Sequence, residues 1–446
     1  MSTVRKLKAS ITGNAFFYVP LAVIALFTLV LIVHYGVNTP FYDQWEMVPL
    51  FQKIDHHTLG FADLWRQHNE HRIFFPLLAA LISAYITHWQ TSAEVLIGFI
   101  CAVATATLLF RLVKKTILRW TTLAGALIAA WFFSPVQWGN WLWGWQLEWF
   151  MCVLFVVATI FLLFKFVDPV QKRYRKELFA GALATAFLAT FSLASGVFAW
   201  LIGIFLLAFG KQPKKPVIIW TAAGILTTAL YYYHYAQTET PNGPATTVLV
   251  HHVFLFVEFF VAFIGSIAGA NNGNIQTADL VGAMLLLAVV PLLWVVWTRR
   301  DKNLRLCLPW LAIILYGLLC ALSTAFGRLG YGIGFALSSR YTTLSLLYII
   351  GLIGLTFTLL INTERISRST KHMIIGLVVL FNVPILISSY VIGVQGFQSQ
   401  SALFKEIKSC THAQDPTDSC LQLTYPNPQV VRPRLEYVKA KGLAGY

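Results

Sequence analysis

The sequence predicts an all-α integral membrane protein with about eleven crossing helices, in a range of about 11–13, and juxtamembrane helices in its first outer loop. Three observations predict this class. Of the 446 residues, 57% are hydrophobic and only 11% are charged. Apolar runs of about 17–22 residues, each long enough to cross a bilayer as a helix, recur along the chain. Basic residues gather in short segments between these runs.

The crossing helices are expected where the apolar runs are clearest. These runs cover residues 15–36, 94–112, 120–134, 147–165, 178–194, 196–210, 216–235, 279–297, 306–325, 341–361 and 373–394. The first is too long for the apolar part of a signal peptide and lacks a small-residue cleavage site, so we expect it to be a retained helix. Two further apolar stretches, Ile73–Trp89 and Val250–Ala270, are expected not to cross fully. The former is short and contains Pro76, and the latter carries Glu258.

The placement of the basic residues predicts the topology. Of the 33 Lys and Arg residues, 22 lie in six short segments, namely Arg5–Lys8, Arg111–Arg119, Lys165–Lys176, Lys211–Lys215, Arg299–Arg305 and Arg365–Lys371. With eleven crossings, all six segments fall on the cytoplasmic face with the N-terminus, and the C-terminus falls outside. The net charge of +15 therefore reflects topology and does not indicate nucleic-acid binding. We expect a membrane domain over residues 1–395 and a short extracytoplasmic tail over residues 396–446.

The first outer loop, residues 37–72, is the most polar part of the chain. Five of the 18 carboxylates and four of the 11 histidines fall between Asn38 and Arg72. Charge at a membrane surface is costly to hold near lipid, so it indicates a working face. Asp43 and Glu46 are three residues apart and would share one side of a short helix. One carboxylate could act as a general base while the other orients it or binds a divalent cation. The alternative is that both are ordinary solvated acids.

The same loop ends in a second group of chemically capable side chains, Glu70, His71 and Arg72, which would lie within one helical turn. An arginine can bind two phosphate oxygens, and a histidine can add a hydrogen bond or move a proton. The alternative is an interfacial anchor, because Arg and His commonly flank membrane helices.

The segment Gln137–Trp149 contains five of the 15 tryptophans. An aromatic belt at the lipid headgroups is one interpretation. Polar residues interleaved with the rings favour a pocket for a sugar or a prenyl phosphate, because ring faces stack on C–H groups while amides and carboxylates bind hydroxyls. We therefore select Trp143, Gln146 and Glu148 as substrate-binding candidates.

Two arginines mark a later outer segment. Arg328 and Arg340, the latter followed by Tyr341, are the only Lys or Arg residues expected on the outer face between Arg72 and the tail. An anionic partner such as a lipid phosphate is the functional interpretation, and snorkelling to the outer leaflet is the alternative. We expect Arg340 to approach the same outer cavity as Asp43, with Arg72 or His71 on its rim.

The six cysteines separate into two groups. Cys101, Cys152, Cys307 and Cys320 lie in or beside the apolar runs, where they pack as small apolar residues. Cys410 and Cys420 lie in the expected tail, where they could form a disulfide in an oxidising compartment or remain free. No zinc-type spacing of Cys and His is present.

Taken together, these residues resemble the GT-C superfamily of polytopic glycosyltransferases, which carry an acidic residue in the first outer loop. The pattern is similar to that of bacterial members of this type. The matching pieces are Tyr42–Trp45, Gln67–Arg72, Ser195–Gly196, Leu337–Thr343 and Tyr425–Pro426.

The resemblance implies an inverting transferase of a bacterial inner membrane, which moves a hexose or pentose from a polyprenyl-phosphate donor to a cell-envelope glycan, lipid or protein. Asp43 would deprotonate the acceptor hydroxyl, and Arg72, Arg340 or both would stabilise the departing phosphate. No clean Asp-x-Asp is present, so no cofactor is indicated, and use of a divalent cation is left open. A flippase, polymerase or ligase of lipid-linked saccharides is the alternative.

Overall fold

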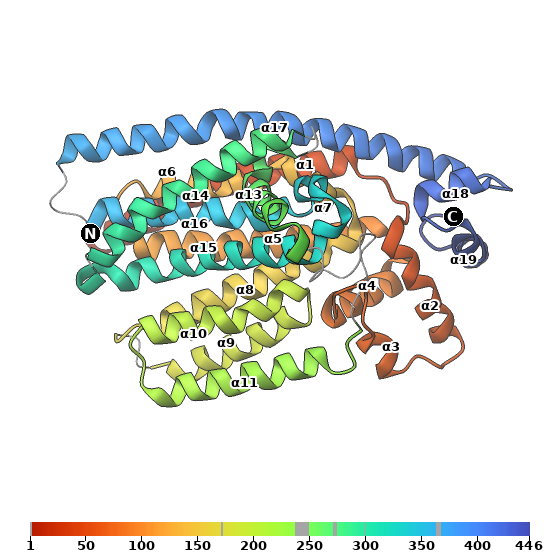
Figure 1. Cartoon of the computed structure of the whole chain (residues 1–446), viewed down its shortest axis with the longest axis horizontal. Helices are drawn as coiled ribbons and strands as arrows, with labels where there is room; N and C mark the ends of the chain where they lie inside the picture. The colour runs from red at the N-terminus through yellow and green to blue at the C-terminus, as the bar shows by residue number, and fades with distance from the viewer. Residues whose placement is uncertain (1, 171–172, 237–248, 271–273, 299, 363–366) are drawn as a thin grey trace.

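The computed structural model describes residues 2–170, 173–236, 249–270, 274–298, 300–362 and 367–446. Every regular element in these residues is a helix, which confirms the all-α class (Figure 1). The longer helices are α1 (Ser2–Tyr35), α4 (Phe74–Thr87), α5 (Thr91–Thr116), α6 (Thr121–Phe132), α8 (Leu147–Phe166), α9 (Arg175–Thr190), α10 (Phe198–Phe209), α11 (Lys214–Tyr232), α13 (Val253–Gly269), α14 (Ile275–Thr298), α15 (Arg300–Arg328), α16 (Thr342–Asn362), α17 (Arg368–Thr411) and α19 (Pro428–Lys441).

Short helices connect and cap this bundle. They are the 3-10 helices η1 (Tyr42–Met47), η2 (Pro135–Gln137), η3 (Gly144–Gln146), η4 (Ala194–Val197), η5 (Leu329–Tyr331) and η6 (Ile333–Leu337), and the α-helices α2 (Val48–Asp55), α3 (Phe61–Trp65), α7 (Trp138–Leu142) and α18 (Asp418–Thr424). The first outer loop therefore folds into η1, α2 and α3, as the sequence predicts.

Length and apolar composition identify the helices that are able to cross a membrane by themselves. Seven stretches in the described residues meet both conditions, namely Phe16–Tyr35, Thr91–Thr116, Gly144–Phe166, Ile275–Thr298, Leu304–Tyr331, Thr342–Leu360 and Arg368–Thr411. Helix α4 has 14 residues and is therefore about 21 Å long, short of the ~30 Å hydrocarbon layer. The total of about eleven crossings remains a prediction from charge placement.

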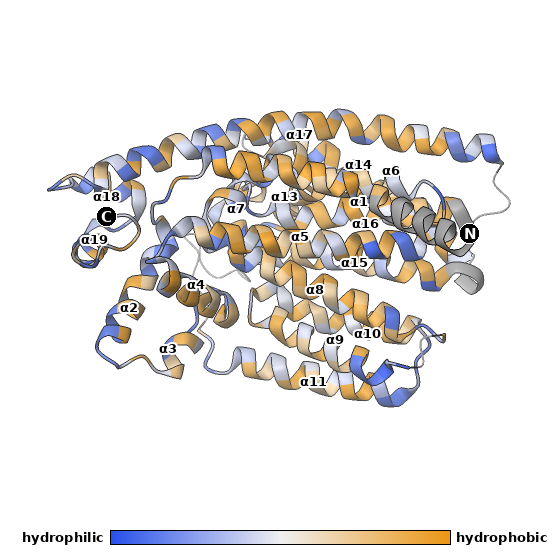
Figure 2. Cartoon of the chain, turned by 180° about the vertical axis from the view of Figure 1, so that it is seen from behind, coloured by the Kyte–Doolittle hydropathy of each residue, from blue (hydrophilic) through white to orange (hydrophobic). Residues whose placement is uncertain are grey.

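The two ends of the bundle differ in chemistry. Helix α1 begins at one end, where the connection between α10 and α11 and the start of α17 also lie, and Figure 2 shows hydrophilic residues gathered there. The C-terminus lies at the other end beside α2, α3, α18 and α19 (Figure 1). Apolar residues dominate the helices between these ends (Figure 2). The basic connections and the polar first loop thus occupy opposite ends of the bundle.

Helices α13 and α14 form a very close pair because each presents a glycine to the other. A Cβ on Gly265 would lie 1.8 Å from the backbone oxygen of Ala278, and a Cβ on Gly282 would lie 2.0 Å from that of Val261. Small residues that let two backbones approach are a common way to pack helices in a membrane.

Helix α17 extends the bundle into the C-terminal tail. Its 44 residues span about 66 Å, roughly twice the hydrocarbon thickness. The boundary expected between residues 395 and 396 falls inside this helix. A disulfide between Cys410 and Cys420 joins the end of α17 to α18. Residues 412–446, called the tail below, are thereby connected to the rest of the chain by both the backbone and the disulfide.

Candidate functional site

A cavity of about 210 Å³ lies at the end of the bundle away from the basic connections. Helix α8 begins at this cavity and carries the basic residue Lys165 in its last turn, while α15 begins at Arg300 and ends at the cavity. The cavity is lined by Asp43, His68, Asn69, Glu70, His71, Gln146, Glu148, Trp149, Leu193, Ala194, Ser195, Val197, Phe198, Tyr232, Ser323, Thr324, Gly327, Arg328, Arg340, Tyr341 and Leu344. Residues from at least five separate chain segments therefore meet in one space.

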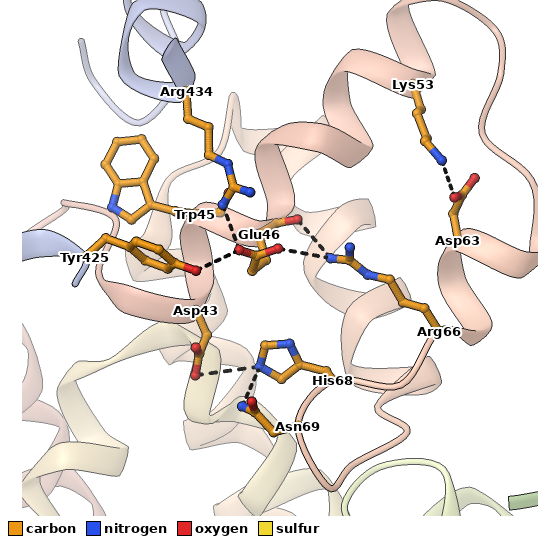
Figure 3. A network of polar contacts seen from close by, with 10 residues as sticks. All are labelled: Asp43, Trp45, Glu46, Lys53, Asp63, Arg66, His68, Asn69, Tyr425 and Arg434. Carbon is orange, nitrogen blue, oxygen red and sulfur yellow. Dashed lines mark hydrogen bonds and ion pairs between the residues drawn. The ribbon is translucent and has the colours of Figure 1, made fainter. Parts of the chain in front are cut away.

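Asp43 enters the cavity from η1. Its carboxylate Oδ2 lies 3.7 Å from Nε2 of His68, and 29% of the side chain is exposed (Figure 3). His68 in turn packs against the Trp145 ring, with the ring centres 5.2 Å apart. Asp43 is therefore open to a ligand on one side and flanked by an imidazole on the other.

The expected helical turn over residues 68–72 is instead a tight reversal of the chain. The backbone N–H groups of His68 and His71 each donate to the other residue's carbonyl oxygen at 2.8 Å. Asn69 sits at the tip with φ of 50°, a left-handed conformation that Asn tolerates well. This reversal places His68, Asn69, Glu70 and His71 on the cavity wall.

His71 is held in its neutral form. Its Nδ1 accepts a hydrogen bond from the backbone N–H of Ala194 at 3.3 Å, so the ring proton belongs on Nε2. Burial lowers the pKa of His71 to about 3, and the nearby charges of Arg328, His68 and Arg340 act in the same direction. His71 is therefore a hydrogen-bond donor near neutral pH and not a cation.

Arg72 does not line the cavity, contrary to the expectation that it would bind phosphate. Successive side chains of an extended segment point in opposite directions, so Arg72 turns away from the cavity that His71 faces. Its side chain is 4% exposed and donates to the backbone oxygens of Tyr231 at 2.6 Å and Trp65 at 2.8 Å. It also donates to the oxygen of Tyr233, so it caps the end of α11 as a structural cation.

The other two arginines do reach the cavity, and their surroundings differ. Arg328 Nη2 forms an ion pair with Glu70 Oε2 at 2.6 Å. In the part of the chain that the structure describes, the Arg340 guanidinium forms no ion pair, and it lies 5.5 Å from the centre of the Tyr341 ring. Arg340 is therefore the cation available to an anionic ligand, while Arg328 shares its charge with Glu70.

The tryptophan segment is folded into the protein rather than exposed as a belt. The Trp141 ring stacks on Phe150 with the centres 4.4 Å apart, and Trp143 donates its Nε1 hydrogen to the backbone oxygen of Phe41 at 3.0 Å. Trp143 is therefore not among the lining residues. Gln146 and Glu148 do line the cavity.

In the described part of the chain, Gln146 and Glu148 each carry one side-chain oxygen without a hydrogen-bond partner. Oε1 of Gln146 and Oε2 of Glu148 are buried and have no hydrogen-bond partner among the described residues. The two side chains are 1% and 5% exposed. Buried polar atoms are nearly always paired, so these two oxygens in the cavity wall are available to a polar ligand or to water.

Glu46 also faces away from the cavity, although 3-10 spacing stacks it over Asp43. Its carboxylate accepts hydrogen bonds from Arg434 and Tyr425 of the tail and lies 3.7 Å from the guanidinium of Arg66 (Figure 3). The expectation that the two acids share one site is therefore not met. Across the described ranges, no group of three His, Cys, Asp or Glu side chains has a metal-binding arrangement.

Several lining residues were not selected as site residues from the sequence. Trp149 stands at the edge of the tryptophan segment, and its ring lies 5.7 Å from that of Tyr341. Ser195 lies in the Ser195–Gly196 turn, whose residue pattern was the available signal. Phe198, Ser323 and Thr324 lie on apolar helices and carry no sequence signal that separates them from lipid-facing neighbours.

No protein-family model matches the sequence, and no curated protein sequence matches it. Several solved structures are similar to the chain, three of which are the following. The archaeal oligosaccharyltransferase AglB from Archaeoglobus fulgidus, in complex with an inhibitory peptide and a dolichol-phosphate, has a TM-score of 0.44 and 14% identity over 94% of this chain and 60% of its own. The Archaeoglobus fulgidus oligosaccharyltransferase in complex with Zn and sulfate has a TM-score of 0.44 and 15% identity over 92% of this chain and 57% of its own.

The third structure, ArnT from Cupriavidus metallidurans bound to undecaprenyl phosphate, has a TM-score of 0.40 and 12% identity over 95% of this chain and 76% of its own. The chain thus spans about three fifths of the length of the oligosaccharyltransferases to which it is similar.

Proposed function

We propose that the chain is a membrane glycosyltransferase that moves a sugar from a polyprenyl-phosphate carrier to an acceptor hydroxyl on the outer face of the membrane. The observation that carries this proposal is the composition of the cavity. It combines a partly exposed carboxylate, Asp43, with the guanidinium of Arg340 and with one buried oxygen each of Gln146 and Glu148. Among the described residues, this guanidinium forms no ion pair and these two oxygens have no hydrogen-bond partner. A base, an anion site and sugar-binding acceptors are what such a transfer requires.

In the proposed reaction, Asp43 takes the proton of the acceptor hydroxyl as the acceptor oxygen forms a bond to the anomeric carbon. The bond between that carbon and the phosphate oxygen breaks, and its electron pair leaves with the phosphate. Attack from the opposite face inverts the anomeric centre. The leaving phosphate gains negative charge, which Arg340 offsets directly and Arg328 offsets in part because it is paired with Glu70.

The neutral His71 has a different role in this scheme. Because its Nδ1 accepts from Ala194, its Nε2 hydrogen is available to the cavity. A neutral donor can orient a phosphate oxygen or a sugar hydroxyl without adding charge. We assign His71 to binding rather than to proton transfer.

The size of the cavity favours one sugar over a longer glycan. Sites for drug-sized ligands occupy about 300–1,000 Å³. The cavity here has about 210 Å³. A hexose or pentose on a single phosphate is therefore the donor head that we propose, and cell-envelope glycans, lipids or proteins are the acceptor classes.

An apolar space along two of the helices that line the site supports a lipid-linked donor. A larger cavity of about 870 Å³ lies between α10, α14 and α15. Helices α10 and α15 line the polar cavity at Phe198 and Ser323 and the apolar cavity at Phe205 and Leu318. An isoprenoid chain whose phosphate lies at Arg340 would have apolar helix faces along which to extend.

The same space argues against the flippase alternative. A transporter of saccharides needs polar side chains along the path across the membrane. The larger cavity is lined by apolar residues and one basic residue, Lys211. A polymerase or ligase would share the chemistry of the polar cavity and would differ in its acceptor.

The test is transfer in proteoliposomes that contain the purified protein and undecaprenyl phosphates carrying radiolabelled hexoses or pentoses. Envelope material from cells that lack the protein supplies the acceptor. We expect label to move from the lipid fraction to the acceptor fraction. Label that changes leaflet but stays on the lipid would support a flippase instead. Label that remains on every donor, without transfer or movement, would contradict the proposal.

A further inference from the structure

The tail contacts the segment that carries Asp43 at several points. Asn38 donates to the backbone oxygen of Ala444 at 2.8 Å, and Lys441 forms an ion pair with Asp55 at 2.7 Å. Tyr437 also donates to Asp55 at 2.7 Å. The first outer loop and the last 35 residues therefore fold against each other, although nearly 400 positions separate them.

The contacts nearest to the catalytic candidate are made by three tail residues. Thr424 accepts from Trp45 Nε1 at 2.7 Å and donates to the backbone oxygen of Pro40 at 3.0 Å. The tail thus binds the backbone before Asp43 and the side chain after it. Trp45 is fully buried, so this contact is part of the core.

The other two tail residues donate hydrogen bonds to Glu46. Arg434 Nη1 donates to Glu46 Oε1 at 2.7 Å and to the backbone oxygen of Trp45 at 3.2 Å, and the Tyr425 hydroxyl donates to the same Glu46 oxygen at 3.1 Å. Burial raises the pKa of Glu46, but the hydrogen bond and charge of Arg434, the Tyr425 hydroxyl and Arg66 together bring it below its ordinary value. Figure 3 shows the Glu46 carboxylate directed to the tail and the Asp43 carboxylate directed to His68.

The backbone beside Asp43 requires such support. Tyr42 has φ of 46°, a left-handed conformation that costs a residue with a Cβ about 1–2 kcal/mol. A strained residue persists only where its surroundings hold it. The tail contacts at Pro40, Trp45 and Glu46 lie on both sides of this residue.

We infer that the tail is a positioning element of the site, in which Thr424, Tyr425 and Arg434 hold η1 so that Asp43 faces the cavity, with Glu46 as their anchor. This inference rests on the proposed function, because it assigns Asp43 as the base. Glu46 and Arg434 are then positioning residues that touch neither donor nor acceptor. The disulfide between Cys410 and Cys420 keeps α18, and with it Thr424, close to the end of α17.

The kinetic test uses Glu46→Gln and Arg434→Gln in the transfer assay. A small displacement of a catalytic group can cost up to ~100-fold in rate, so we expect kcat to fall about 10–100-fold with KM for the donor unchanged. Arg434→Lys keeps a charge beside Glu46 and should restore part of the rate. The double variant should lose little more than either single variant, because both remove the same contact.

The control variant is Lys441→Gln. It removes another ion pair between the tail and the first loop, at the far end of α2 from η1. This pair is exposed, so its loss should change stability by at most about 1 kcal/mol and leave kcat unchanged. Wild-type kcat in both Glu46→Gln and Arg434→Gln, or an equal loss in Lys441→Gln, would overturn the inference.

A second readout does not depend on activity. The thiol introduced by Asp43→Cys should react slowly with a methanethiosulfonate reagent when η1 is held. It should react several-fold faster when Arg434→Gln is added, after subtraction of the signal from the protein without the introduced thiol. Equal reaction rates would overturn the positioning role. If Asp43→Cys shows this change in reactivity but the protein that keeps Asp43 transfers no sugar, the result would contradict the proposed function alone.

Discussion

Asp43 and Glu46 show how the fold separates two similar residues. Both are acids, they are three positions apart, and both lie on η1. Asp43 lines the cavity with 29% of its side chain exposed, whereas Glu46 is occupied by Arg434 and Tyr425. A carboxylate already bound by a guanidinium and a phenol is a poor general base, because both donors stabilise its charged form. Spacing alone could not distinguish the two residues.

The arginines differ in the same way, and a pair of variants tests the difference. Arg340→Lys keeps the charge but loses the fork that binds two phosphate oxygens. A hydrogen bond to a charged group is worth about 1.5–3 kcal/mol, so we expect kcat/KM to fall about 10–100-fold with little change in Tm. The measurement is transfer rate and thermal unfolding of the same preparation.

Arg72→Gln is the contrasting variant. Arg72 is buried and its partners are backbone oxygens at the end of α11, so its removal leaves buried acceptors unsatisfied at about 1–3 kcal/mol each. We expect a clear loss of Tm, with the folded fraction retaining its kcat. A normal Tm combined with lost activity would show that Arg72 acts in the site and not as a structural cation.

His71 predicts a dependence of stability on pH. The pKa of His71 is about 3 in the folded protein, against an ordinary value of 6.5. Below pH 6.5 the unfolded chain binds a proton that the folded site excludes. The contribution of His71 to the free energy of unfolding is therefore fully present above pH 6.5. It is lost as the pH falls toward 3, by up to about 1.4 kcal/mol per pH unit. Between pH 7.5 and 5.0, Tm should fall more steeply in the wild type than in His71→Asn, and parallel curves would contradict the assignment.

At the scale of elements, the polar end is assembled by segments that the bundle brings together. The reversal at residues 68–71, the start of α8 and the end of α15 each contribute lining side chains. Each segment is short, and its direction is fixed by a rigid helix next to it. Helix α17 adds the tail to this end because it continues well beyond the apolar run that ends near residue 394. The site therefore depends on helix packing at a distance.

The pair α13 and α14 offers a test of that packing. Gly282→Ala would place a methyl group 2.0 Å from the Val261 oxygen, so the helices must separate at a cost of about 1–3 kcal/mol. Gly376→Ala is the matched control, because its methyl group meets nothing within 4 Å and alanine favours a helix by about 0.5–1 kcal/mol. Tm should fall in the first variant and hold or rise in the second. Equal Tm values would show that the close contact contributes nothing.

For the whole molecule, charge placement predicts which end faces the cytoplasm. A cysteine in place of Lys214, at the basic end, should react with an impermeant thiol reagent only after the cells are opened. A cysteine in place of Asp415, in the tail, should react in intact cells. The protein without the added cysteine supplies the background. Labelling of the Lys214 variant in intact cells would reverse the topology.

The sequence was sufficient for the class of the fold and for much of the cavity wall. Apolar runs and basic segments depend on composition, so they can be recognised without knowledge of the contacts between residues. Asp43, Glu70, His71, Gln146, Glu148, Arg328, Arg340 and Tyr341 were selected from the sequence and line one cavity. Their roles in binding and catalysis remain predictions.

The other assignments required the structure. Arg72 turns away because the chain reverses at Asn69, and Glu46 turns away because residues almost 390 positions later bind it. Trp143 donates its Nε1 hydrogen to the backbone oxygen of Phe41 and does not line the cavity. Whether Cys410 and Cys420 form a disulfide or remain free depends on how α17 and α18 meet, and the structure has the disulfide. Each of these outcomes is set by contacts between distant segments, which residue type and local spacing do not encode.

The central claim is that Asp43 and Arg340 act as base and phosphate site in one cavity. The most direct test measures donor binding and single-turnover transfer in the wild type, Asp43→Asn and Arg340→Gln. We expect Asp43→Asn to bind polyprenyl-phosphate sugar normally and to transfer it about 10²–10⁴-fold more slowly, while Arg340→Gln loses binding as well. Transfer by Asp43→Asn at more than about a tenth of the wild-type rate, or normal binding and transfer by Arg340→Gln, would contradict the account.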